Sequence, residues 1–283
     1  MIGLDGRRLV AVARKEAREY RRTPFIIGAM AVLPLIFMIN PVITIFAIGA
    51  TVKAATVTKA VGATFLVLLV VPAVIPASIA AYSVVGERDQ GTLEPLLTTP
   101  VRRGEILIGK ALVAAVPAVG IAYILFALAV ILAHFFAGNP TVAATLTEGS
   151  HILAQALFAP LLAVWSIGVG TAISARSSDV RVAQQLGTLA SLPPLAVTAL
   201  VSFQIVPLGV GTAVGFGLGL LVIDIAMWRA VAATFDRERL ITGSRAVKTT
   251  GVGPGGPPAG TVRRIQAFGG ADHGGGDAKW PVA

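Results

Sequence analysis

The side chains that could perform chemistry are few and lie far apart along the chain. His134 and His151 flank a loop that also holds Glu148. Two histidines and a carboxylate are a ligand set that binds iron in enzymes. Their spacing is long and unconstrained, so we favour ordinary polar residues here, with a metalloenzyme as the alternative hypothesis.

Several common kinds of catalytic site are absent from the sequence. The chain has no cysteine, which excludes disulfides, thiolate nucleophiles and cysteine metal sites. It also has no G-x-S-x-G, H-E-x-x-H or Walker A motif, so it cannot bind ATP through a P-loop of its own. We therefore predict that the chain is not an enzyme, has no catalytic residue or metal site, and carries no cofactor.

The composition indicates a membrane protein of all-α fold. Hydrophobic residues make up 55% of the chain and charged residues 13%, and the mean hydropathy is +0.82. A membrane-spanning helix needs about 20 apolar residues. This length predicts a polytopic bundle of six transmembrane helices, at 24–50, 61–85, 111–136, 152–173, 186–206 and 208–228. Pro193 and Pro194 are expected to kink or break the fifth helix, since proline donates no backbone hydrogen bond.

The distribution of positive charge predicts the orientation. Short cytoplasmic loops collect Lys and Arg. With both termini in the cytoplasm, every basic residue except Lys53 and Lys59 falls on the inner side. The formal net charge of +9 then faces an anionic lipid bilayer, and we expect no nucleic-acid partner.

Asp224 is the acidic residue that falls inside a predicted span. Charged groups are expensive at membrane depth. We favour snorkelling to the inner interface, or pairing with a basic residue such as Arg229 of a neighbouring subunit. An ion-coupled secondary carrier built around Asp224 is the alternative, although proton relays usually need several titratable groups in series.

Other small or polar residues in the spans predict helix packing. Gly211, Gly215 and Gly219 recur at four-residue spacing in the sixth span, so another helix can approach closely, within the subunit or across a dimer. Gly209 and Gly217 lie beside them. The isolated polar residues Asn40, Gln155 and Ser166 are expected to bond to other helices rather than to a substrate.

The two ends of the chain have their own patterns. Segment 1–23 reads as an interfacial amphipathic helix, with Leu9, Ala13, Ala17 and Tyr20 on one face. The other residues assigned to this connecting helix are Arg14, Lys15, Glu16, Arg18 and Arg22. A solvated basic leader is the alternative. Segment 24–235 holds the six spans, and the Gly/Pro-rich tail 236–283 is expected to be disordered and cytoplasmic.

The loop 86–110 is long, charged and patterned. Leu93, Leu96 and Leu97 recur at helical spacing between Thr92 and Pro100, which predicts a short amphipathic helix. Glu94 lies near the beginning of this helix, and the charged residues around it are Glu87, Arg88, Asp89, Arg102 and Arg103. An apolar knob ringed by charges suits docking to a soluble partner. A helix that lies on lipid headgroups is the alternative.

The same loop carries a family resemblance. Its elements are Glu87-Arg88, Gly91-Thr92-Leu93-Glu94, Leu96-Leu97, Thr99-Pro100, Arg103, Glu105-Ile106-Leu107 and Gly109-Lys110. This segment resembles the coupling loop of ABC-2 type permeases, the membrane subunits of ATP-binding cassette exporters. Lys15-Glu16, Arg21-Arg22 and Pro24 resemble the family's N-terminal connecting helix, and Ala175-Arg176 with Ala183-Gln184-Gln185 its second inner loop.

The resemblance implies partners and an activity. Such permeases pair as homo- or heterodimers in the cell membrane, and each contacts an ABC ATPase subunit through the coupling helix. ATP and magnesium then belong to that ATPase. The substrate would be a drug, lipid, peptide or ion moved outward. The chain departs from larger members in its bare connection at 204–207, so we expect no large external module.

Overall fold

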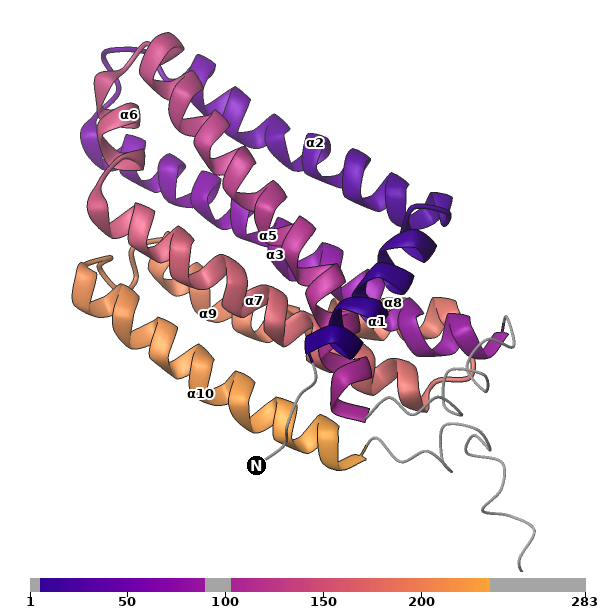
Figure 1. Ribbon diagram of the computed structural model, residues 1–283. Helices are drawn as coiled ribbons and strands as arrows, with labels where there is room; N and C mark the ends of the chain where they lie inside the picture. Colours follow the sequence, from indigo (N-terminus) through magenta and orange to yellow (C-terminus); the bar gives the residue numbers. More distant parts are fainter. Residues whose placement is uncertain (1–5, 90–102, 235–283) are drawn as a thin grey trace, which may run out of the picture. The chain divides into compact units, whose positions relative to one another are not determined.

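A computed structural model describes residues 6–89 and 103–234, all of which lie in the first of two compact units, Met1–Gly243. These ranges are almost wholly helical and contain no strand (Figure 1). The predicted tail 236–283 lies outside the described residues. The helices are α1 Gly6–Tyr20, α2 Pro24–Ala47, α3 Ala54–Asp89, α5 Arg103–Phe136, α6 Pro140–Leu146, α7 Gly149–Arg176, α8 Val180–Ala190, α9 Leu192–Ser202 and α10 Val210–Thr234.

The six-span prediction is confirmed by helix length and composition in the described part of the chain. The spans are Ile26–Ala47, Ala54–Tyr82, Ile108–Phe136, Gly149–Arg176, Val180–Ser202 and Val210–Val231. The second starts seven residues before its predicted beginning at 61. Backbone hydrogen bonding continues through polar residues such as Thr58 and Lys59, whereas hydropathy detects only the apolar part of a helix.

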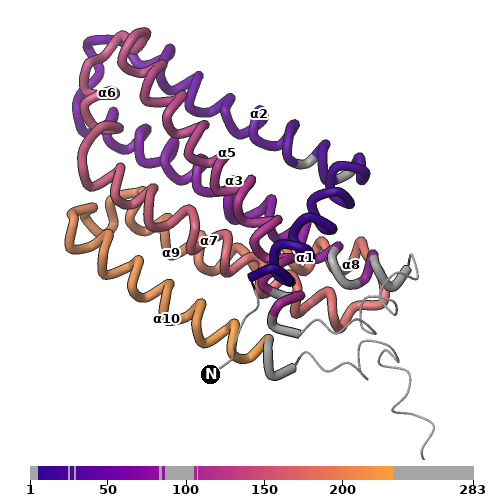
Figure 2. The backbone as a smooth tube through the Cα atoms, in the orientation of Figure 1, coloured from indigo at the N-terminus to yellow at the C-terminus, as the bar shows by residue number. Residues whose placement is uncertain are grey.

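Helix α3 lies at the centre of the bundle. Its span is 67% buried, against 24% for α2 and 22% for α10, which run along opposite edges (Figure 2). The most extensive helix contact is between α3 and α7. A methyl group at Gly170 of α7 would lie 2.9 Å from the carbonyl oxygen of Ala77 in α3, so this contact depends on the missing side chain.

The fifth span is broken, as its prolines predicted. It consists of α8 and α9, with Ser191 between them. Pro194 cannot donate a hydrogen bond to the carbonyl of Ala190, one turn earlier. The indole Nε1 of Trp165 in α7 donates to that oxygen instead, at 3.0 Å. A neighbouring helix thus satisfies the backbone group that proline leaves open.

The short helix α6 was not predicted. Asn139 caps it by accepting a hydrogen bond from the Thr141 amide at 3.0 Å, and Pro140 occupies its first position. The Asn139 amide also donates to the carbonyls of Gly49 and Val52, at 3.2 and 3.3 Å. Asn139 therefore ties the α5–α6 connection to the α2–α3 turn.

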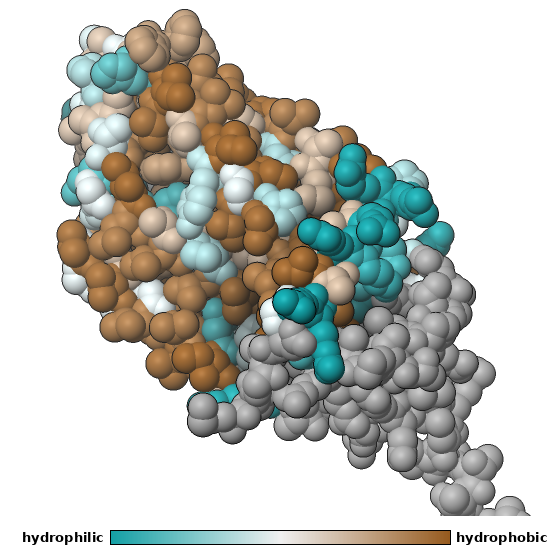
Figure 3. All heavy atoms as spheres, in the orientation of Figure 1, coloured by the Kyte–Doolittle hydropathy of each residue, from teal (hydrophilic) through white to brown (hydrophobic). Residues whose placement is uncertain are grey.

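One end of the bundle, which we call the basic end, collects α1, the last turn of α3, the first turn of α5, and the Arg176 end of α7 (Figure 1). Lys53 and Lys59 lie at the opposite end, beside the α2–α3 turn. In the space-filling view, hydrophobic residues cover most of the visible helices and hydrophilic ones gather over α1 (Figure 3). The predicted segregation of positive charge along the bundle thus holds for the described residues.

Candidate functional site

Helix α1 is fastened to α5 by a buried ion pair at the basic end. The ammonium group of Lys110 lies 3.1 Å from both carboxylate oxygens of Glu16. The two side chains are only 5% and 2% exposed. Lys15 lies 3.2 Å from the Glu16 carboxylate and 3.0 Å from Glu19. These four residues, Lys15, Glu16, Glu19 and Lys110, are called the clamp below.

A close backbone approach accompanies the clamp. A methyl group at Gly109 would lie 2.6 Å from Cγ1 of Val12, which is itself 5% exposed. Helix α1 therefore crosses α5 directly over Gly109, and a larger residue there would push the two helices apart. In the next turn toward the amino terminus of α5, Glu105 and Ile106 are buried.

The pairing of α1 with α5 was missed at the level of sequence. Lys15-Glu16 and Gly109-Lys110 each resemble family elements, but no sequence pattern connects residues 94 positions apart. The available signals were an acid that shares a helix face with Val12 and Tyr20, and a lysine directly before an apolar run. Neither signal identifies its partner.

On the amphipathic face, Tyr20 is buried and Leu9, Ala13 and Ala17 are half-buried, as predicted, whereas Arg14, Arg18 and Arg22 are exposed.

The predicted coupling segment can be placed only by its two ends. Glu87 and Arg88 lie in the last turn of α3, and Arg103 is the first residue of α5. The remaining predicted coupling residues, Gly91, Thr92, Leu93, Glu94, Leu96, Leu97 and Pro100, lie outside the described residues, as does the predicted short helix. The segment 90–102 thus joins two helices that contact each other.

The carboxyl-terminal half of α3 is braced by α7 and α8. The Val85 amide donates a hydrogen bond to the Ser174 hydroxyl at 3.0 Å, and Ser174 is fully buried. A methyl group at Gly187 of α8 would lie 3.2 Å from the Cβ of Ala81. Small residues thus let three helices pack tightly just before segment 90–102.

The alternative metal site is not assembled. The Nδ1 atom of His151 lies 3.8 Å from a Glu148 carboxylate oxygen, and its ring packs edge-on against Phe65. His134 instead contacts the ring of Phe135. Within residues 6–89 and 103–234 no three His, Cys, Asp or Glu side chains gather closely enough to hold a metal ion. The metal-site hypothesis failed because residues that are close in sequence near helix ends need not direct their side chains toward a common centre.

Asp224 is buried against α7. The prediction that its side chain snorkels to the inner interface is therefore wrong. Asp224 is 2% exposed, and neither carboxylate oxygen has a hydrogen-bond partner among the described residues. Together with Trp228 and Arg229 it lines a cavity of about 450 Å³. Its placement depends on the rotation of α10, which composition does not reveal. Pairing with a neighbouring subunit stays a prediction.

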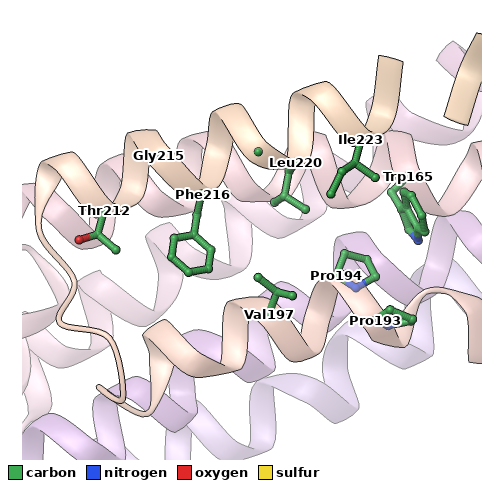
Figure 4. Close-up of a pocket in the computed structure, with 10 residues that line it drawn as sticks. Trp165, Pro193, Pro194, Val197, Thr212, Gly215, Phe216, Leu220 and Ile223 are labelled. Carbon is green, nitrogen blue, oxygen red and sulfur yellow. The ribbon is translucent and has the colours of Figure 1, made fainter. Parts of the chain in front are cut away.

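Three of the α10 glycines do not pack against any other described residue of the chain. A methyl group at Gly211, Gly215 or Gly219 would meet no other heavy atom within 4 Å, whereas one at Gly217 would contact Leu157. Gly215 and Gly219 instead line an apolar cavity of about 580 Å³ between α9 and α10. Figure 4 shows Phe216, Leu220 and Ile223 of α10 there, opposite Pro193, Pro194 and Val197 of α9. These glycines were predicted to pack within the subunit or across a dimer, and packing across a dimer stays a prediction.

The isolated polar residues behave differently from one another. Asn40 accepts a hydrogen bond from the Thr64 hydroxyl at 3.3 Å, so it joins α2 to α3 as predicted. Gln155 and Ser166 are buried, yet their side chains have no hydrogen-bond partner in the described part of the chain. The prediction that they bond to other helices is wrong for these two within that part.

The chain matches a known protein family over most of its length. A family model described as ABC-2 family transporter protein matches residues 10–215, which run from α1 through the first turns of α10 and include the clamp. No curated protein matches the chain. Since the matched residues cover well over half of the sequence, the chain belongs to the ABC-2 transporter family.

Proposed function

We propose that this chain is the permease subunit of an ABC exporter, working as a dimer with a separate ATPase. The ATPase binds ATP and magnesium and docks on segment 90–102. The permease dimer moves a drug, lipid, peptide or ion outward across the cell membrane. Both termini of the chain then face the cytoplasm, together with the basic end.

The clamp is the observation that carries this proposal. Segment 90–102 is anchored at both ends to helices, and one of them, α5, is fixed to α1 through Glu16 and Lys110. A force on the segment therefore cannot be absorbed by sliding α5 past α1. It moves α1 and the first turns of α5 together, which is how a local push becomes a rigid-body motion.

The brace on α3 supports the second half of the mechanism. Val85, hydrogen-bonded to Ser174, connects the α3 end of the segment to α7. Apart from α3, the helix that α7 contacts most extensively is α10. Motion of α3 is thus passed to α7 and α10, which bound the apolar cavity between α9 and α10. Gly211, Gly215 and Gly219 leave one face of α10 uncovered by other described residues. This supports the proposal that a second permease subunit packs against that face.

A co-purification experiment tests the docking. Leu96→Asp combined with Leu97→Asp places two charges on the predicted apolar knob. We expect this variant to lose both co-purification with the ATPase and stimulation of its ATP hydrolysis. Ala11→Asp is the matched control, because Ala11 is exposed on α1 at the same end but lies outside the docking segment. Undiminished co-purification and stimulation in the double variant contradict the proposal.

One observation favours the second candidate, an ion-coupled carrier. Asp224 is a buried carboxylate without a hydrogen-bond partner among the described residues, and such groups often mark ion pathways. In a carrier, Asp224→Asn abolishes transport even when the ATPase is active. In an ATP-driven exporter, transport by this variant continues and stops only when ATP is withheld. Measuring uptake into inverted vesicles with and without ATP separates the two.

A further inference from the structure

An apolar groove runs along the outside of the bundle where α1 meets α2 and α5. Its volume is about 550 Å³, and its floor includes Met30 of α2 and Leu112 and Val116 of α5. Leu112 is 42% exposed and Val116 66%. Unlike the cavity between α9 and α10, this groove has cationic side chains, Arg14 and Arg21, in its lining.

The groove lies where two of the candidate membrane spans begin. The adjoining spans begin at Ile26 and Ile108, whereas α1 ends at Tyr20 and crosses α5 at Gly109. The groove therefore extends from the amphipathic helix into the first turns of two spans. Amphipathic helices at this depth lie at the boundary of headgroups and acyl chains.

Arg14 and Arg21 form a cationic rim. Arg14 lies on α1, Arg21 lies in the turn that directly follows α1, and both line the groove. Both are exposed, and neither has an ion-pair partner in the part of the chain that the structure describes. The acids of α1 are engaged elsewhere, since Glu16 binds Lys110 and Glu19 binds Lys15.

We propose that this groove binds one anionic phospholipid, with the phosphate between Arg14 and Arg21 and an acyl chain along Leu112 and Val116. Arg14 and Arg21, which have no ion-pair partner among the described residues, place two guanidinium groups at the end of an apolar groove. This arrangement complements a ligand that is anionic at one end and aliphatic at the other. A zwitterionic lipid also fits the apolar groove, but its headgroup has no net charge and neutralises less of the positive charge of Arg14 and Arg21. Lipid binding in this groove requires that the protein spans a membrane, but it does not require that the protein transports a substrate.

Binding of phosphatidylglycerol to the purified full-length protein in detergent, followed by native mass spectrometry, tests the headgroup site. We expect Arg14→Gln with Arg21→Gln to lower the affinity roughly 30-fold, which corresponds to about 2 kcal/mol. Arg18→Gln with Arg22→Gln is the matched control. It removes the same charge from exposed positions of the same segment that do not line the groove, and we expect less than a threefold change.

Filling the groove tests the acyl site with every charge in place. We expect Val116→Trp to weaken binding of phosphatidylglycerol with long acyl chains by tenfold or more, and Leu112→Trp serves as a second variant. Phosphatidylcholine should bind at least tenfold more weakly to the parent protein, and glycerol phosphate should not compete.

Four results overturn the proposal. The first is an equal loss of affinity in the two double-arginine variants, and the second is phosphatidylcholine binding as tight as that of phosphatidylglycerol. The third is an unchanged affinity in both tryptophan variants. The fourth is the mass of a protein dimer in place of a lipid adduct, if Val116→Trp abolishes that dimer. The last would assign the groove to a second copy of the chain.

Discussion

Replacing Lys110 by methionine isolates the contribution of the buried ion pair. Methionine keeps most of the aliphatic stem and removes the ammonium group, so Glu16 loses its partner at 3.1 Å. Removing one member of a buried pair costs about 3–5 kcal/mol. Because Lys15 still lies 3.2 Å from Glu16, we expect the lower limit, a loss of about 3 kcal/mol in the free energy of unfolding.

The measurement is equilibrium unfolding in mixed micelles, followed by circular dichroism. A loss of about 3 kcal/mol lowers the folding equilibrium constant roughly 150-fold. Lys15→Met is the control, since Lys15 is 35% exposed and an exposed pair contributes about 0.2–1 kcal/mol. A double-mutant cycle with Glu16→Gln should give a coupling energy of about 1–3 kcal/mol.

A small effect would refute this reasoning. If Lys110→Met changes the free energy of unfolding by less than about 1 kcal/mol, the pair behaves as a solvated surface pair. The clamp could then not hold α1 to α5 against a force on segment 90–102. A stable Lys110→Met protein with undiminished stimulation of ATP hydrolysis would lead to the same conclusion for coupling.

Three further substitutions test other contacts by the same unfolding measurement. Gly109→Ala should destabilise by about 1–3 kcal/mol because its methyl group would lie 2.6 Å from Val12, and Val12→Ala should restore most of the loss; no rescue would show that the helices do not cross here. Trp165→Phe removes the donor to the Ala190 carbonyl and should cost about 1–3 kcal/mol; an unchanged stability would mean that another group satisfies this oxygen. Asp224→Leu should stabilise the protein by about 1–3 kcal/mol, since it removes a buried polar group without a hydrogen-bond partner among the described residues; a loss of stability would indicate a partner such as a second subunit.

The spans could be predicted because hydropathy is a local property of about 20 consecutive residues. The break near Pro193 was equally local, since a missing backbone donor is fixed by residue type. What the sequence did not predict was its repair by Trp165, which lies in another helix. The short helix α6 was missed although Asn139 and Pro140 form a recognisable start signal, because a helix of seven residues has little periodicity to detect.

The candidate site was predicted only in parts. Glu16 and Lys110 were both assigned to family elements, but their contact depends on where α1 crosses α5. Gly215 and Asp224 illustrate the same limit, because the rotation of α10 leaves the glycine open and buries the acid against α7. Rotation about a helix axis follows from packing against all neighbours, and a single helix that is apolar on every side carries no record of it.

The central place of α3 affects how the protein must be assembled during synthesis. Helix α3 contains the second span, yet Gly62 packs directly against the backbone carbonyl of Ser202 at the end of α9. Its main partner, α7, is also made later. The helix that ends up most enclosed by protein must therefore first be stable while surrounded by lipid, held in the bilayer by its own hydropathy. Its neighbours α8 and α9 replace that lipid only after the fifth span has left the ribosome and entered the membrane.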